Sequence, residues 1–244
     1  AALPLAQRTL ANLPDRGYTL AKPLGLLLWG FAFWLLTSLG LLQNTTGGVL
    51  FALLLVAGLS FWLAGGWRGI KKTYFLVKAR SRLVLISEGL FLLAFILWAV
   101  MRAANPQVSG TEKPMEMAFI NAILRSPSFP PQDPWLSGYA ISYYYFGYVI
   151  VAMLIRLTGV ASGVGFNLAV ASWFALAALT SYGVVYNLLS VANRASEERG
   201  KRLFNPQWHA LLAPVMLLIV SNLGGLLEVL HASGQFWQKG PTGW

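Results

Sequence analysis

The sequence predicts an all-α protein, a polytopic transmembrane helical bundle with an external loop that carries juxtamembrane helices. Hydrophobic residues make up 57% of the 244 residues and charged residues only 11%, whereas a soluble domain carries about 25% charged residues. Apolar runs of about 20 residues, the length that crosses a bilayer, recur along the chain. We therefore predict a single transmembrane domain over residues 1–244. Because the chain starts at Ala1 and ends in a loop-like sequence, we expect it to be the N-terminal part of a longer protein.

Six apolar segments are candidates for membrane helices. The hydrocarbon core has no water to bond peptide groups, so segments of this kind are expected to be helical. The third contains one acid, Glu88, near its start, and the fourth is short and rich in tyrosine. The segments are residues 24–42, 47–66, 83–101, 139–155, 157–193 and 208–227.

The net charge of +10 is explained by short basic loops between these segments. Lys and Arg in such loops orient membrane proteins with the basic side in the cytoplasm, so we do not predict nucleic-acid binding. Loop 67–82 holds six basic residues and is predicted to be cytoplasmic, on the same side as residues 1–23. The third span then places loop 102–138 outside the cell membrane.

The segment 139–155 decides the topology of the second half. Residues 194–202 are basic and should be cytoplasmic. That requires one of the two preceding apolar segments not to cross the membrane. Since Tyr favours the interface, we predict a juxtamembrane or re-entrant helix for residues 139–157, with a conventional helical hairpin as the alternative.

The external loop holds the candidate chemistry. A helix is predicted over residues 114–125, lying along the membrane surface, and a start near Thr111 would bring Glu112 and Glu116 onto one face at i,i+4 spacing. Carboxylates at a membrane face can act as a general base or hold a divalent metal ion. The alternative is that these acids are only solvated.

The remaining polar residues support structural interpretations better than functional ones. Glu88 is predicted to pair with Arg80 or Arg82 of the neighbouring basic loop rather than to form an intramembrane ion site. His209 and His231 lie too far apart in sequence for metal-ligand spacing, and the absence of cysteine excludes thiolate metal sites.

Several linked motifs resemble a bacterial and archaeal membrane protein family of uncharacterised function that is named for its Tyr-Tyr-Tyr motif. Members of that family are usually longer than this chain. The motifs are EKPMEMAF at residues 112–119, FPPQDPWLSG at 129–138, YYYFGY at 143–148, LPDRGY at 13–18 and FNL at 166–168.

More distantly, the layout resembles GT-C glycosyltransferases, in which an acidic motif opens the first large external loop. The resemblance implies a polyprenyl-phosphate sugar donor and a catalytic acid at Glu112 or Glu116, with Glu228 matching a second acid. This chain lacks the Asp-Glu or Asp-x-Asp motif at the expected place, which leaves the use of a metal ion open. The substrate-binding residues expected on this hypothesis are Arg102, Lys113, Arg125, Asp133, Trp135, Tyr143, Tyr144 and Tyr145.

The sequence is therefore compatible with three functions. The first is sugar transfer at the external membrane face, with membrane lipids and the lipid-linked donor as partners. The second is a non-catalytic subunit of a larger membrane complex, in which the tyrosines form an interfacial aromatic belt. The third, a transporter, is disfavoured because the spans contain few polar or Gly/Pro-broken positions.

Overall fold

The computed structural model describes residues 1–110, 112–197 and 204–234, and within these ranges it confirms the all-α prediction, with helices and no strand. The chain divides into two compact units, residues 1–180 and 181–244. The helices of the first unit are α1 (Leu3–Thr9), α2 (Ala21–Ser38), α3 (Thr46–Leu63), α4 (Gly66–Ala79), α5 (Ser81–Ala104), α6 (Lys113–Arg125), α7 (Phe146–Thr158) and the first half of α8 (Ser162–Glu197).

Four helices of the described residues, α2, α3, α5 and α8, are long and apolar enough to cross a membrane. They correspond to four of the six predicted segments. Large apolar side chains on them remain exposed, among them Leu54 at 69% and Leu85 at 72%. Exposed leucines in such number are expected where the surface faces lipid, so the protein is an integral multi-pass membrane protein.

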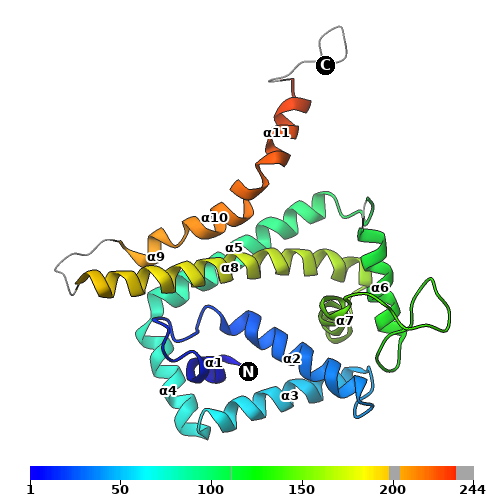
Figure 1. Cartoon of the computed structure of the whole chain (residues 1–244), viewed down its shortest axis with the longest axis horizontal. Helices are drawn as coiled ribbons and strands as arrows, with labels where there is room; N and C mark the ends of the chain where they lie inside the picture. Colours follow the sequence, from blue (N-terminus) through cyan, green and yellow to red (C-terminus); the bar gives the residue numbers. More distant parts are fainter. Residues whose placement is uncertain (111, 198–203, 235–244) are drawn as a thin grey trace. The chain divides into compact units, whose positions relative to one another are not determined.

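The predicted loop 67–82 is largely a helix, which corrects the sequence interpretation. Gly65 and Gly66 both have positive φ angles and turn the chain from α3 into α4 (Figure 1). Trp67, Tyr74 and Phe75 are exposed on α4 beside its basic residues. A basic and aromatic helix of this kind suits a membrane surface.

The core of the first unit lies around α7. Its residues Val149 to Met153 are buried, and it packs against α6, α2 and α3 (Figure 1). At 13 residues, α7 is about 20 Å long, shorter than a bilayer core of about 30 Å. The prediction of a helix in this region is confirmed, but it begins at Phe146 rather than at residue 139.

The acid of the third span pairs with residues of the N-terminal segment. Glu88 on α5 forms an ion pair with Lys22 of α2, and its other oxygen accepts a hydrogen bond of 2.8 Å from Tyr18. The paired interpretation of Glu88 is confirmed, whereas the choice of Arg80 or Arg82 as its partner was wrong. Sequence proximity suggested Arg80 or Arg82, but the fold brings Lys22, at the start of α2, to Glu88 from a distant part of the sequence.

The second unit contains a broken helix where an uninterrupted one was predicted. Residues 206–218 and 223–232 are bent by 59°. At the break the Ser221 hydroxyl donates to the Leu217 carbonyl, and Gly224 and Gly225 follow, which weakens the helical ladder there. Of the predicted basic segment 194–202 and the C-terminal residues, 198–203 and 235–244 lie outside the described residues. The elements are the end of α8, α9 (Pro206–His209), α10 (Leu212–Leu218), η1 (Val220–Asn222) and α11 (Leu223–Ala232).

Candidate functional site: an acid and tyrosine cluster

The helix α6 positions the two candidate acids. It begins at Lys113, with Pro114 in its first turn, where a missing N–H costs nothing. It ends at Arg125, and the following residue, Ser126, has the extended backbone expected before Pro127. The predicted helix 114–125 is thus confirmed. Glu112 stands just before the first turn and Glu116 within it, one turn apart.

Tyrosines from the following segment face these acids. The Tyr148 hydroxyl donates to Glu116 Oε1 at 3.5 Å. The Tyr143 hydroxyl donates to the Tyr144 hydroxyl at 2.6 Å, and their rings are stacked with centroids 3.9 Å apart. We call Glu112, Glu116, Tyr143, Tyr144 and Tyr148 the acid–tyrosine cluster.

Aromatic rings around Phe119 of α6 pack against the tyrosines of the cluster. Phe119 is buried and contacts Tyr143 and Tyr148, with ring centroids 5.6 and 5.8 Å away. Trp135 meets the same ring edge-on at 5.4 Å. The rings fix where the two tyrosine hydroxyls lie relative to the acids.

The surroundings raise the pKa of two tyrosines of the cluster. Burial, followed by the negative charge of Glu116, raises the pKa of Tyr148 to about 12. The hydrogen bond to Tyr144 and then burial raise the pKa of Tyr143 to about 12, with a smaller effect from the charge of Glu112. Both hydroxyls therefore remain hydrogen-bond donors at neutral pH.

A second group of predicted residues forms a pocket beside the cluster. Its volume is about 270 Å³, and Trp135 links it to Phe119. Asp133 uses its Oδ1 to accept hydrogen bonds from the backbone N–H groups of Trp135 and Leu136, so that oxygen shapes the loop. The pocket is lined by Ala122, Arg125, Ser126, Gln132, Asp133, Pro134, Trp135, Ser137 and Gly138.

Two predicted residues have structural partners elsewhere. Arg102, at the end of α5, donates from Nε to the Asn167 side chain of α8 at 2.7 Å. The Tyr145 hydroxyl accepts from Trp34 Nε1 of α2 at 3.1 Å. Lys113 is half-buried at the start of α6. Glu228, the predicted second acid, is exposed on α11 in the second unit.

Sequence reasoning missed Tyr148 and Phe119. Tyr145 was chosen with its two neighbours as part of one motif, yet Tyr148 is the residue hydrogen-bonded to Glu116. Helical spacing could have found Phe119, which follows Glu116 by three residues and therefore shares its face of α6.

The arrangement offers two carboxylates and three phenols at a protein surface. Among the described residues, no three His, Cys, Asp or Glu side chains lie close enough together to hold a metal ion. Chemically, the carboxylates can accept a proton, the phenols can donate hydrogen bonds, and the aromatic faces can pack against the apolar face of a sugar or an isoprenoid.

Comparison with known proteins identifies the family. Residues 28–239 match the family described as uncharacterized membrane protein (DUF2298). The chain belongs to this family. The DUF2298 match covers α3 to α7 completely and includes every residue of the acid–tyrosine cluster. It agrees with the multi-pass membrane family expected from the sequence motifs. No curated protein and no solved structure matches this DUF2298 chain.

Proposed function

We propose that this DUF2298 protein is a GT-C-like glycosyltransferase of the cell membrane that moves a sugar from a polyprenyl-phosphate donor to an acceptor at the external face. The observation that carries the proposal is the acid–tyrosine cluster, in which Glu116 accepts a hydrogen bond from Tyr148 within an aromatic surface. The resemblance of the external loop to that of GT-C enzymes supports it.

The reaction assigns a role to each acid. The acceptor hydroxyl attacks the anomeric carbon of the sugar, and the bond between that carbon and the phosphate oxygen breaks. Glu112 takes the proton from the hydroxyl as it attacks, because it stands at the exposed start of α6. Glu116, hydrogen-bonded to Tyr148, positions the phenols and maintains the negative field of the site.

The leaving polyprenyl phosphate requires cationic and donor groups. Lys113 adjoins Glu112 at the start of α6, and Arg125 lines the pocket beyond Trp135. Preorganised cations and hydrogen-bond donors of this kind stabilise charge that develops in a transition state. Arg102 is assigned a structural role instead, because Asn167 and the Gln107 carbonyl already engage its guanidinium.

The aromatic residues would hold the donor. Tyr144 and Trp135 are exposed, at 75% and 63%, beside the polar groups of the cluster. An exposed aromatic at a membrane interface can contact both an isoprenoid chain and a sugar. The apolar surfaces of the candidate spans supply the lipid environment from which such a donor would enter.

The test is whether membranes gain sugar-transfer activity when the full-length protein is expressed in them. Membranes that contain it are incubated with a polyprenyl phosphate carrying a radiolabelled hexose, and label is followed from the lipid to water-soluble or protein-bound products. Water can replace the acceptor, so slow release of free sugar is also expected. Equal release from membranes lacking the protein, across several donor sugars, would contradict the proposal.

A second candidate, a non-catalytic subunit of a membrane complex, is favoured by one observation. Asp133 and Tyr145, both predicted to bind substrate, are engaged in the loop turn and in packing on α2. On this hypothesis the external loop is a rigid cap that presents Trp135 and Tyr144 to a partner subunit.

A further inference from the structure

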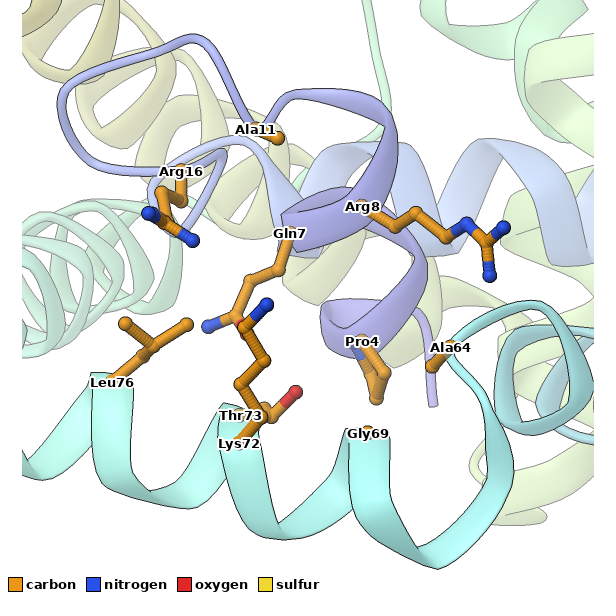
Figure 2. Close-up of a pocket in the computed structure, with 10 residues that line it drawn as sticks. All are labelled: Pro4, Gln7, Arg8, Ala11, Arg16, Ala64, Gly69, Lys72, Thr73 and Leu76. Carbon is orange, nitrogen blue, oxygen red and sulfur yellow. The ribbon is translucent and has the colours of Figure 1, made fainter.

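A separate cavity lies between α1, the loop after it and α4. Its volume is about 280 Å³, and Figure 2 shows its wall formed on one side by α4 and on the other by α1. The lining residues are Pro4, Gln7, Arg8, Ala11, Arg16, Ala64, Gly69, Lys72, Thr73 and Leu76.

The cavity is lined by positive charge. Arg8, Arg16 and Lys72 are cationic, and none of the ten described residues that line it is acidic. In Figure 2 the Lys72 and Gln7 side chains point toward each other, and Arg16 enters from the side of Leu76. Gln7 is only 8% exposed, so the surrounding residues hold its side chain in place where it lines the cavity. Three cations with an amide and a hydroxyl suit an anion with several oxygens.

The loop after α1 holds Arg16 in a strained backbone conformation. Arg16 has a φ of 54°, a left-handed conformation that side-chain-bearing residues rarely adopt. The buried Asp15 stabilises it, because its carboxylate accepts from Gly17 N–H at 2.8 Å and from Thr19 N–H at 3.0 Å. A strained residue held by a buried network is a pointer to function.

The other wall is fixed to α3. The backbone N–H of Leu5 donates to the Ser60 hydroxyl at 3.2 Å, and the Arg8 guanidinium donates to the Leu63 carbonyl. In Figure 2 the Arg8 side chain runs away from Gln7, in keeping with that contact. Arg16 and Lys72 are therefore the cations most available to a ligand.

The cavity and the C-terminal end of the external helix α6 lie at opposite ends of α3. At its start, Asn44 donates to the carbonyls of Ile123 and Ser126, at the end of α6. At its finish, Leu63 and Ala64 meet Arg8 and the cavity. The 18 residues of α3 span about 27 Å, nearly the thickness of the hydrocarbon core. The cavity thus belongs to the cytoplasmic side of the predicted topology.

The helix α4 places the cavity at headgroup depth. It exposes Trp67, Tyr74 and Phe75 together with Lys71 and Lys78. A helix with exposed aromatics and basic residues lies in the interface plane and attracts anionic lipids.

We propose that this cavity binds the phosphate of an anionic phospholipid headgroup from the cytoplasmic leaflet. Arg16 and Lys72 contact the phosphate oxygens, and the amide of Gln7 donates to the same group. The inference goes beyond the proposed sugar transfer and does not depend on it. A free phosphate shares this chemistry, but α4 offers an apolar and aromatic surface for acyl chains beside the cavity.

Lipid retention tests the proposal. The full-length protein is purified in micelles with equal phosphatidylglycerol and phosphatidylcholine, and retained lipid is measured by mass spectrometry. The Arg16→Gln, Lys72→Gln variant should lose phosphatidylglycerol about tenfold or more, because it removes both cations that contact the phosphate in the cavity. The matched control, Lys71→Gln, Lys78→Gln, removes the same charge from exposed positions of α4 that do not line the cavity and should retain the lipid.

Each result decides the proposal. Equal retention by the double variant and its control would overturn it, because the attraction would then be a property of the whole basic surface. The assignment to a lipid would also be overturned if inorganic phosphate raised the melting temperature of the protein in phosphatidylcholine micelles and added phosphatidylglycerol did not. If the double variant does not fold, the single variant Lys72→Gln replaces it in the lipid-retention measurement, because it alters only an exposed side chain.

Discussion

The hydroxyl of Tyr148 on α7 lies 3.5 Å from the carboxylate oxygen Oε1 of Glu116 on α6. This contact joins two helices that pack closely, and Glu116 is half-buried beside it. Phe119 lies against the same tyrosine, with ring centroids 5.8 Å apart. An acid held in this way has a defined position relative to any ligand that reaches the phenols.

The first prediction concerns the pKa of Tyr148. Burial and the charge of Glu116 raise it to about 12, so Glu116→Gln should lower it, because the negative charge that disfavours the phenolate is removed. The measurement is the ultraviolet pH titration of each protein minus that of its Tyr148→Phe counterpart. An unchanged difference titration would mean that Glu116 and Tyr148 are not neighbours.

The same shift has a consequence for stability at high pH. The pKa of Tyr148 in the folded protein exceeds the value of about 10 expected in an unfolded chain. Its contribution to stability is therefore complete below about pH 10 and is lost as the pH rises toward 12. Tyr148→Phe should remove part of this high-pH destabilisation, as followed by thermal unfolding in micelles.

The second prediction concerns packing of α2 on α7. A Cβ added at Gly30 would lie 2.6 Å from Ile150 Cγ1, a contact that forces the core to shift. Gly30→Ala should destabilise the fold by about 1–3 kcal/mol. Gly58→Ala, on α3, is the matched control, since nothing lies within 4 Å of its added Cβ. Equal unfolding midpoints for the two variants would contradict the close approach of α2 and α7.

The third prediction concerns topology. In this cysteine-free chain, Ser109→Cys should react with a membrane-impermeant thiol reagent from outside intact cells, while Ala79→Cys and Ala195→Cys should react only after permeabilisation. The reason is that α7 is too short to cross and the basic segments favour the cytoplasm. Labelling of Ala195→Cys from outside would favour the helical hairpin over the re-entrant helix.

Much of the helical architecture could be predicted from the sequence, because a helix that crosses lipid requires a continuous run of about 20 apolar residues. The first three predicted spans differ from α2, α3 and α5 by a few residues at their ends. The helix 114–125 was located by its proline boundaries. The helix α4 is not predicted from the sequence, because the six basic residues of segment 67–82, four of which lie on α4, were attributed to a loop. Trp67, Ile70, Tyr74 and Val77 nevertheless follow a helical spacing.

The tertiary contacts could not be predicted because they join residues far apart in the chain. Nothing local to Glu88 indicates that Tyr18 and Lys22 are its partners. Likewise Tyr143, Tyr144 and Tyr145 are equivalent as a motif, yet Tyr145 packs toward Trp34 while the other two join the acids. These three tyrosines precede the start of α7 at Phe146 on a segment without regular secondary structure, so neither helical nor strand periodicity predicts where each ring points.

The most direct test of the central claim is sugar transfer by acid-to-amide variants of the full-length protein. Glu112→Gln keeps the shape of the side chain but removes its capacity to accept a proton, so transfer from a radiolabelled polyprenyl-phosphate hexose should fall by about 100-fold or more. Sugar transfer should fall less in the Glu116→Gln variant. It should be unchanged in the Tyr139→Phe variant, because Tyr139 is an exposed residue of the same loop outside the cluster. Expression and elution volume in micelles should match the wild type for all three. Undiminished transfer by the Glu112→Gln, Glu116→Gln double variant would contradict the assignment of these acids to catalysis.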